Sequence, residues 1–485
     1  MINKHIIYRI LGVLLYIEAL LLALCSSFGF YYKENDNTAF LISAGISTII
    51  ASILVYLGKN AEKRFSRRDG YIIVSVSWIV FSVIGMLPYY LSGSIPSITD
   101  AFFETISGFT TTGATILNEI EALPHGLLFW RSMTQWIGGL GIVFFTIAVL
   151  PIFGASGVQL FAAEATGPKH DKVHPRIEVT AKWIWALYLG LTIAESLFLF
   201  IGGMGWFDSI CHSLATTSTG GYSTRQDSIA AYNSPYIEYV ITIFMFLSGI
   251  NFTLIFLSVF KGRINKLRED TEFKWYIGII ASFTLIITIG LTLSNNNGDI
   301  EESFRHALFQ VVSIQTTTGF ITSDYMLWPT ILWFLITLLM YVGACAGSTS
   351  GSIKCIRIAM LFKLIHNEFK RIVHPNAVIP LHINKHVIRS QIKITLLAFF
   401  TLFITLIIIG WGVLMALGIS FMDSYGIIVS CLGNIGPGIG NYGPAYSWAN
   451  LPNAAKWVSA FFMLIGRLEL FSVLLLFTPN FWRKR

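Results

Sequence analysis

The stretch Thr316-Thr317-Thr318-Gly319-Phe320 decides the fold, because the chain spells nearly the same five residues at three other places. Each copy follows a short apolar segment that is flanked by two longer ones. A single Thr-Gly turn carries little information, whereas four copies at similar spacing predict a repeated structural unit. The other copies are Thr110 to Ala114, Thr217 to Gly221 and the weaker Gly433 to Pro437, and the glycines Gly113, Gly220, Gly319 and Gly436 fall 107, 99 and 117 residues apart.

The composition places this repeat in a membrane. Of the 485 residues, 54% are hydrophobic and only 12% are charged, and the mean hydropathy is +0.67. Apolar runs of about 20 residues, the length that a bilayer requires, recur from end to end. The first run continues to about Tyr32 and is expected to be a retained span, not a cleaved signal. The five cysteines are scattered, without the spacing of a metal site. The sequence therefore predicts an all-α polytopic membrane protein.

The distribution of charge predicts the orientation of the chain. The net charge is +7, and most of the 33 Lys and Arg residues lie in alternate loops. Because positively charged loops stay on the cytoplasmic side, both termini are predicted to be cytoplasmic. The opposite loops are rich in acidic residues, which favours an outer surface that concentrates cations. The basic clusters lie at 59–68, 169–182, 261–274, 354–393 and 483–485.

An N-terminal hairpin of helices over 10–32 and 38–58 is expected to precede the four units. In each unit a long span is followed by a segment of about 12 residues, which is too short to cross a bilayer. If this segment crossed, the charge asymmetry would invert at every repeat, so it is predicted to enter and leave on the outer side. Asp100, Asp208 and Asp423 are capping-type residues at the starts of such segments. The predicted divisions are the hairpin with its basic loop (1–66) and four pore repeats (67–170, 171–268, 269–375 and 376–485).

This arrangement predicts a site for a monovalent cation. Each Thr-Gly turn would lie at membrane depth as non-helical backbone, which is tolerated only where protein buries it or where it lines a watery cavity. Four half-helices would point the negative ends of their dipoles toward one axis. A ring of backbone carbonyls can then replace the water shell of the ion without any charged side chain. Glycine permits the unusual dihedrals and the close approach of backbone that such turns need.

With these residues the chain resembles the Trk-type potassium-uptake subunits of the Trk/Ktr/HKT superfamily, over nearly its whole length. The initial hairpin is more similar to Trk than to Ktr subunits. Glycine at all four filter positions favours potassium, since relatives with serine at the first tend to admit sodium. Beyond the turns, the resemblance includes Trp130-Arg131, Gln135 to Gly141, Ala163 to Pro168, Gly249 to Phe252, Gly347 to Gly351 and Gly466 to Glu469.

The resemblance implies a potassium filter, a dimer and a regulator. Potassium is the transported ion, and no covalently bound cofactor and no nucleic-acid partner are expected. The protein would be a homodimer in the bacterial inner membrane, in contact with lipid. A cytosolic nucleotide-binding regulatory subunit of the TrkA type would dock on the basic loops at 261–274 and 354–393. The carbonyls that coordinate potassium would be those of Thr111, Thr112, Gly113, Ser218, Thr219, Gly220, Thr317, Thr318, Gly319, Asn434, Ile435 and Gly436.

Two further features lie below the predicted filter. Residues 343–353 interrupt an apolar span with small polar residues, which favours an unwound loop over a tightly packed helix face. Arg467 lies within a span, where a charge is costly and is expected to be functional. It follows Gly436 by the 31 residues that separate Ser350 from Gly319 and Asn251 from Gly220, so Asn251 is a candidate pore-lining residue. An ion pair of Arg467 with Glu469 is the competing interpretation. The resemblance implies that this loop is a gate, and Arg467 is expected to complete it as an electrostatic barrier that the closed loop reinforces. The predicted gate residues are Gly343, Gly347, Ser348, Thr349, Ser350, Gly351 and Arg467.

Other function classes are less well supported. A membrane-embedded enzyme would need convergent nucleophiles, bases or metal ligands, whereas the polar clusters here are neutral threonines and glycines; no enzyme activity is predicted. A transporter built from inverted repeats does not fit, because the four units run the same way. Glu18 and Glu195 lie in spans, either paired with neighbouring helices or as proton or ion ligands. A passive channel, a proton- or sodium-coupled potassium symporter and a less selective potassium and sodium channel remain alternatives.

Overall fold

The computed structural model describes residues 2–61, 66–153, 177–294, 299–384 and 386–483 of the chain. The motif Ala163 to Pro168 lies outside these ranges. Six helices are long and apolar enough to span a membrane, and two bent pairs of helices raise the number to eight if each pair is one span. These counts concern the described residues alone.

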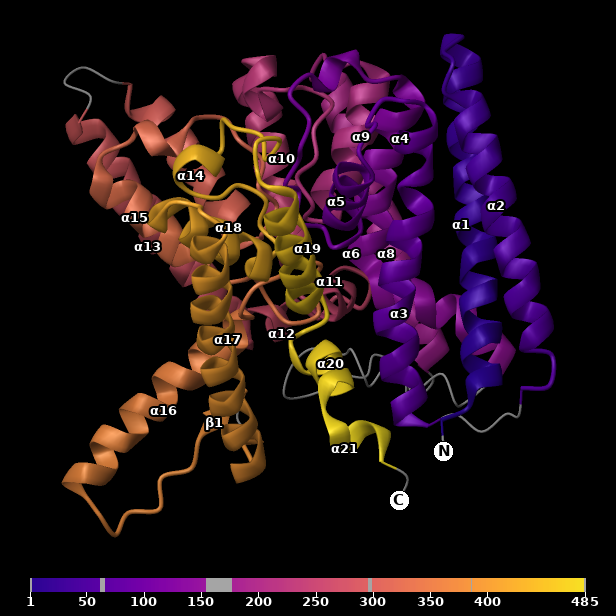
Figure 1. The fold of residues 1–485 in the computed structure, drawn as a ribbon. Coiled ribbons are helices and arrows are strands. Elements are labelled where there is room, and N and C mark those ends of the chain that lie inside the picture. Colours follow the sequence, from indigo (N-terminus) through magenta and orange to yellow (C-terminus); the bar gives the residue numbers. More distant parts are fainter. Residues whose placement is uncertain (1, 62–65, 154–176, 295–298, 385, 484–485) are drawn as a thin grey trace.

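The N-terminal hairpin consists of α1 (Lys4–Tyr32) and α2 (Asn37–Leu57), which pack side by side at one edge of the molecule (Figure 1). Asn3 caps α1 by accepting from the Ile6 amide, and Lys33 ends it in the left-handed region (φ 59°). The Ser47 hydroxyl donates to the Leu15 carbonyl over 2.9 Å. Since α2 leaves several large apolar side chains exposed, its outer surface suits contact with lipid.

Four units follow, each with a first span, a short helix and a second span, as predicted. Loops and short 3-10 helices join the short helices to the second spans. In the first unit these helices are α3 (Arg67–Gly85) with α4 (Leu87–Leu91), α5 (Ile98–Phe109), η1 (Ile120–Ala122) and α6 (His125–Phe153). In the second they are α8 (Ile177–Ile201), α9 (Trp206–Thr217), η3 (Ser228–Tyr232), α10 (Pro235–Ser248) and α11 (Phe252–Val259), followed by α12 (Ile264–Glu269).

The third and fourth units carry the elements that project from the body of the molecule. A short β-hairpin separates the two units and pairs in antiparallel register. The third unit contains α13 (Thr271–Ser294), α14 (Ile300–Gln315), η4 (Tyr325–Leu327), α15 (Thr330–Leu339) and α16 (Cys355–Val373), followed by β1 (His382–Ile383) and β2 (His386–Val387). The fourth contains α17 (Ser390–Ala416), α18 (Phe421–Gly433), η5 (Gly440–Tyr442), α19 (Asn453–Arg467), α20 (Phe471–Leu474), η6 (Leu475–Phe477) and α21 (Pro479–Trp482).

Three of the short helices, α5, α9 and α18, begin two residues before the aspartates predicted at their starts. Ser97 and Ser420 accept from the amides of Asp100 and Asp423, so these aspartates lie in the first turn and are not the caps. Asp299 caps α14, and α9 has no side-chain cap. Acidic side chains in a first turn still oppose the positive end of the helix dipole.

Two predicted continuous spans, 236–260 and 454–478, are broken. The axes of α10 and α11 differ by 102°, and those of α19 and the segment Phe471–Phe477 differ by 110°. Asn251 caps α11 at the first break, and Glu469 and Leu470 have φ 56° at the second. A non-glycine residue with positive φ cannot continue a helix.

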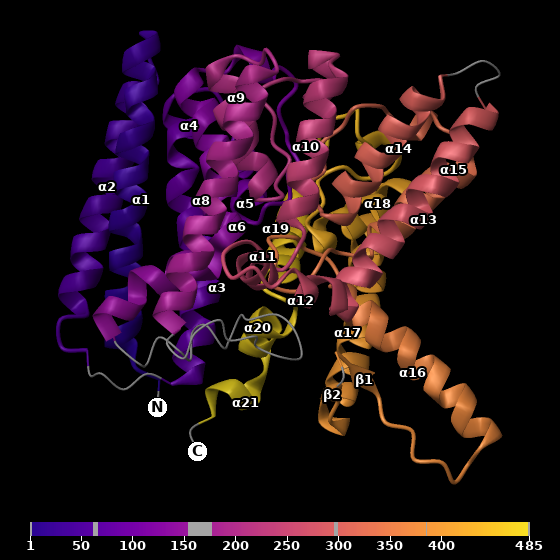
Figure 2. The same cartoon turned by 180° about the vertical axis from the view of Figure 1, so that it is seen from behind.

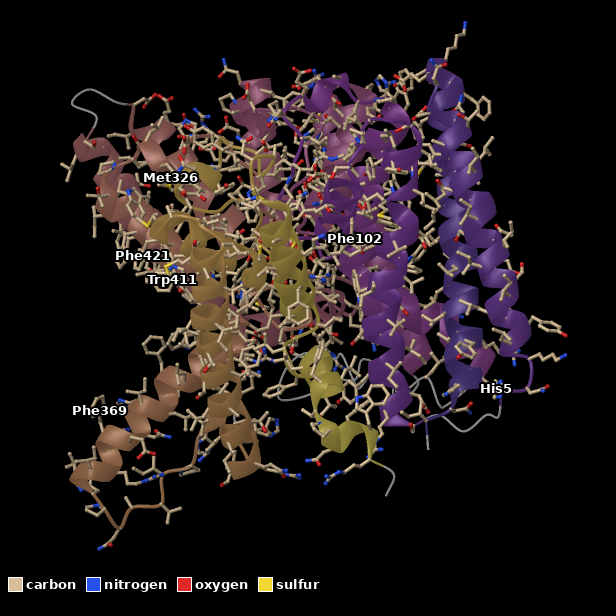
Figure 3. All side chains as sticks on the ribbon, in the orientation of Figure 1. His5, Phe102, Met326, Phe369, Trp411 and Phe421 are labelled. Atoms are coloured by element: carbon tan, nitrogen blue, oxygen red, sulfur yellow. The ribbon has the colours of Figure 1, made fainter. Side chains whose placement is uncertain are left out.

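The beginning of α1, α16, the β-hairpin and α21 lie on the same side of the molecule, here called the terminal side (Figures 1 and 2). The helix α16 projects from the body there, and its side chain Phe369 points away from the other elements (Figure 3). On α17 and α18, Trp411 and Phe421 meet with ring centroids 4.5 Å apart (Figure 3).

Candidate functional site

The four Thr-Gly turns share one backbone conformation. Thr111, Thr219, Thr317 and Asn434 have φ 52°, 53°, 58° and 54°. Two residues later in each turn stands a glycine with positive φ, at 82°, 79°, 81° and 102°. These glycines, here called the glycine ring, are Gly113, Gly221, Gly319 and Gly436.

The second turn is therefore displaced by one residue from the sequence alignment. Gly221, not Gly220, is equivalent to Gly113, and Ser218 is equivalent to Thr110. The two adjacent glycines at 220 and 221 made either register compatible with the sequence. All four members of the glycine ring line one pocket, together with residues such as Tyr222, Ile321 and Trp448, which supports the corrected register.

The glycine ring closes in the order of the repeats. A Cβ on Gly113 would lie closer than 3.0 Å to the Gly220 carbonyl oxygen, and one on Gly221 would meet the Thr318 oxygen in the same way. The equivalent contacts join Gly319 to the Ile435 oxygen and Gly436 to the Thr112 oxygen. Each glycine thus lets its own turn approach a carbonyl of the next turn, and the fourth contact returns to the first.

Serine hydroxyls hold three of the turns against their short helices. Ser107 donates to the Ala114 carbonyl over 2.6 Å, Ser313 to that of Phe320 over 2.8 Å, and Ser430 to that of Gly436 over 2.9 Å. Each serine lies four residues before the threonine or asparagine that has positive φ in its turn. At the equivalent place in the second unit stands Ala215, which has no hydroxyl.

Gln135 of α6 holds the second turn instead. Its Nε2 donates to the Gly220 carbonyl over 2.6 Å, and its Oε1 accepts from the Tyr222 amide over 3.0 Å. No role could be predicted for this glutamine from the sequence, because its partners lie 85 and 87 residues away. A residue of the first unit therefore positions the backbone of the second.

A buried ion pair supports the same two turns. Arg131 and Glu104 lie 2.9 Å apart and are both 1% exposed. Arg131 also donates to the Ser223 carbonyl over 2.9 Å, and its guanidinium lies 4.1 Å from the ring centroid of Tyr222. Glu104 accepts from the Ile116 amide over 3.0 Å. Arg131, which the family resemblance named only within the motif Trp130-Arg131, is thus buried behind the turns.

The segment between α15 and α16, residues 340–354, is unwound, as predicted, and is here called the interrupted loop. It lies directly against three of the four turns. The Gly351 amide donates to the Thr317 hydroxyl over 2.7 Å, and the Thr349 hydroxyl donates to the Thr217 carbonyl over 3.2 Å. A Cβ on Gly351 would be closer than 3.0 Å to the Gly433 oxygen.

The other predicted residues of this loop shape its backbone. Gly343 donates to the Ile353 carbonyl over 2.9 Å, which closes the neck of the loop. The hydroxyls of Ser348 and Ser350 are 3.0 Å apart. Gly347 has φ 78°, and its carbonyl accepts from the Phe252 amide over 3.1 Å. The loop is therefore joined to the break between α10 and α11.

Asn251 belongs to this junction. Its side-chain oxygen accepts from the Thr253 amide over 2.8 Å and the Leu254 amide over 3.3 Å, so it caps α11. A Cβ on Gly347 would lie 3.0 Å from the side-chain nitrogen of Asn251. Asn251 thus lies against the interrupted loop.

Arg467 connects the interrupted loop to α6. Its Nη1 donates to the Thr349 carbonyl over 2.7 Å, and its Nη2 donates to the carbonyls of Gly138 and Gly139 over 2.6 and 3.0 Å. The backbone of α6 departs from helical geometry at Gly141, immediately after these carbonyls. The alternative partner of Arg467, Glu469, is engaged by Arg357 at 2.6 Å.

The oxygens gathered at the glycine ring are neutral. Within the described ranges, no group of three or more His, Cys, Asp or Glu side chains could hold a metal ion. The buried polar atoms of the turns include backbone carbonyls and the hydroxyls of Thr111, Thr219 and Thr317. Such a set of donors suits a weakly held monovalent cation better than a tightly bound divalent one.

Comparisons with known proteins cover the whole chain. A family model described as TrkH, cation transport protein, matches residues 37–484. The Trk system potassium uptake protein TrkH of Salmonella typhimurium is 39% identical over 481 residues, which are 99% of each chain. The protein of the same name from Halomonas elongata is 36% identical over 484 residues, or 99% of this chain and 100% of that protein. The crystal structure of the potassium transporter TrkH from Vibrio parahaemolyticus aligns with a TM-score of 0.89 at 33% identity and covers 99% of both chains.

Proposed function

The chain belongs to the TrkH family of membrane potassium-uptake proteins, and we propose that the carbonyl oxygens around its glycine ring are the selectivity filter through which potassium passes. The closed order of contacts around Gly113, Gly221, Gly319 and Gly436 carries this proposal. A pore made by four turns of one chain needs no second subunit to close it. Backbone carbonyls at fixed positions replace the hydration shell of the ion.

The coordinating set is that of the sequence alignment with its second turn corrected. Potassium would meet the carbonyls of Thr111 to Gly113, Thr219 to Gly221, Thr317 to Gly319 and Asn434 to Gly436. The negative ends of the dipoles of α5, α9, α14 and α18 favour a cation at the level of the turns. Glycine at every position of the ring favours potassium over sodium.

The interrupted loop is the proposed gate, and Arg467 is the residue proposed to hold it closed. The contacts of Gly351 and Thr349 hold the loop against the turns, where it would obstruct the path of the ion. Arg467 adds a positive charge on the same path and fixes the loop by its bond to the Thr349 carbonyl. Opening would require the loop to leave the turns and Arg467 to release it.

Transport assays on the purified protein in liposomes test this function. Uptake of potassium, rubidium and sodium is measured with and without an imposed proton gradient. Uptake of potassium and rubidium in preference to sodium is the expected result, and equal uptake of all three ions would contradict the filter. An effect of the proton gradient beyond its electrical contribution would favour coupled symport over passive conduction.

We also propose the assembly that the family resemblance implies: a homodimer in the inner membrane, with both termini cytoplasmic and a nucleotide-binding regulatory subunit on the basic loops. The exposed basic residues of α16, among them Lys370 and Arg371, offer charge for such a partner. Native mass spectrometry of the detergent-solubilised protein would find a dimer, and a monomer across lipid conditions would contradict it.

A further inference from the structure

The side chain of Glu272, in the first turn of α13, is directed at the interrupted loop. It is only 6% exposed, although it belongs to a helix with a lipid-exposed outer face. One oxygen, Oε1, accepts from the Ala346 amide over 2.6 Å and from the Ile356 amide over 3.1 Å. Ala346 lies in the loop before its tip, and Ile356 lies in the first turn of α16, directly after the loop. These two stretches are here called the arms of the loop.

The two arms are bonded to each other at a neck, and Glu272 accepts a hydrogen bond from each arm beside it. Val342 and Ile353 form an isolated parallel bridge, and the Cys355 amide donates to the Ala344 carbonyl over 3.0 Å. The two bonds to Glu272 lie beside this neck. Two hydrogen bonds to a single side-chain oxygen therefore fix the base from which the tip of the loop reaches the turns.

The first turn of α13 is itself held by the β-hairpin on the terminal side. The Asn384 side chain accepts from the Thr271 amide over 2.7 Å and donates to Asp270 Oδ2 over 2.6 Å. The other oxygen of Asp270 caps α13 by accepting from the Phe273 amide over 2.9 Å. The residue before Glu272 in the chain, Thr271, is thus bonded directly to the hairpin.

A separate apolar cluster joins the same parts. It lies apart from the main core of the molecule and brings hairpin residues together with the loop residue Ala346 and the start of α16. Its buried members are Ala346, Ile356, Met360, Leu381, Ile383, Ile388 and Leu396. Polar and apolar contacts therefore both connect the hairpin to the base of the loop.

We infer that Glu272 is a positioning residue for gating, which seats the interrupted loop under the turns and connects it to the β-hairpin through Asp270 and Asn384. This inference rests on the proposed gating role of the loop. A displacement of the hairpin would move the first turn of α13, and with it the acceptor that holds both arms of the loop.

Potassium flux through the full-length protein in liposomes tests the inference. Glu272→Ala removes the acceptor of both arms and is expected to raise the basal flux at least about fivefold, since two buried hydrogen bonds are lost together. Glu272→Gln keeps an acceptor oxygen without the charge and should give an intermediate flux. The potassium-to-sodium ratio should stay that of the unmodified protein, because the turns are untouched. Glu368→Ala, which removes an exposed carboxylate of α16 that pairs with Arg371, is the matched control with unchanged flux.

Two more variants separate this inference from the proposed gate. Asn384→Gly removes the side-chain bonds at a position with φ 48°, where glycine is tolerated, and should raise the flux less than Glu272→Ala. Arg467→Ala releases the loop at its other side. If Arg467→Ala raises the flux and both Glu272 variants leave it unchanged or lower it, the role of Glu272 is wrong and the gate stands. If no variant raises the flux, the gate and the inference are both wrong. If Glu272→Ala does not fold, the flux of Glu272→Gln decides in the same way.

Discussion

The adjacent glycines of the second turn, Gly220 and Gly221, differ in backbone conformation and in the neighbours that a side chain would meet. Gly221 has φ 79°, and a Cβ there would meet the backbone oxygen of Thr318 in the next turn. At Gly220 the three atoms nearest to an added Cβ all belong to the Gln135 side chain. A side chain can move aside, whereas the backbone of a neighbouring turn cannot move without changing the ring.

The first prediction compares these two positions. Gly221→Ala should lower the potassium-to-sodium uptake ratio at least about tenfold, because both its backbone conformation and its neighbour exclude a side chain. Gly220→Ala should have a much smaller effect. Competitive uptake of the two ions in liposomes measures both ratios. If Gly220→Ala lowered the potassium-to-sodium ratio more than Gly221→Ala, Gly220 would be the equivalent of Gly113, as predicted from the sequence.

The second prediction concerns Gln135, the residue of α6 that replaces the missing serine at Ala215. Gln135→Glu keeps the acceptor for the Tyr222 amide but loses the donor to the Gly220 carbonyl, and it places two oxygens against each other. Gln135→Met loses both bonds. Both variants should lower the potassium-to-sodium ratio, while Gln391→Glu, on the exposed start of α17, should leave it unchanged. An unchanged potassium-to-sodium ratio in both Gln135 variants would mean that the second turn keeps its conformation without the bonds to Gln135.

At the scale of elements, the three broken second spans converge on one place. The break between α10 and α11 is bonded to the interrupted loop, since the Cys345 amide donates to the Gly249 carbonyl over 3.0 Å. The end of α19 is bonded to the same loop through Arg467. The buried Lys354, which is 4% exposed, also donates to the Ser350 carbonyl. Helix breaks in three repeats thus supply the polar groups that hold one loop.

The third prediction follows for Arg467. Its guanidinium bonds the loop and α6 simultaneously, which the single ammonium of lysine cannot reproduce. Arg467→Ala should raise the potassium flux, and Arg467→Lys should give a value between those of the unmodified protein and the alanine variant. Flux is measured in liposomes at equal protein content. An Arg467→Ala variant that folds normally and conducts less would contradict two proposed roles of Arg467: that it holds the loop closed and that its charge is an electrostatic barrier.

These elements also show where prediction from the sequence ended. The hairpin, the four units, the short helices and the unwinding at 343–353 follow from hydropathy, charge and Gly-rich turns, which are local signals. The break at Asn251 is bonded to the interrupted loop, and Glu469 at the other break pairs with Arg357 of α16. These partners lie about 100 residues away, and no local pattern reveals them. Gln135 and Glu272 were missed for the same reason, because each is a single polar residue whose partners lie 74 or more residues away.

At the scale of the whole molecule, the N-terminal hairpin is attached to the pore units by its connecting turn. Glu34 accepts from the His125 amide over 2.7 Å and pairs with His125 Nδ1 at 2.7 Å. The imidazole stacks on Tyr32 with centroids 3.7 Å apart. Asp36 is buried next to this pair and against Gly126, at the first turn of α6. One turn of the hairpin therefore covers the start of a helix that also carries Gln135 and contacts Arg467.

The last prediction uses the pKa of Asp36. Burial, and next the nearby charge of Glu34, raise the pKa of this carboxyl above its ordinary value. A raised pKa in the folded state means that protonation stabilises the fold, so this stabilisation is present at acidic pH and is lost as the pH rises through the folded-state pKa. At a pH above the folded-state pKa, the buried carboxylate is ionised and unfavourable. Asp36→Asn should therefore raise the apparent unfolding temperature at such a pH by about 2 °C, and the gain should shrink as the pH falls through that pKa. Glu34→Gln, which weakens the contact with His125, should lower the unfolding temperature at pH 7. Unfolding of the purified protein, followed by intrinsic tryptophan fluorescence across this pH range, measures both, and a gain for Asp36→Asn that is constant with pH would show that the carboxylate charge is not its cause.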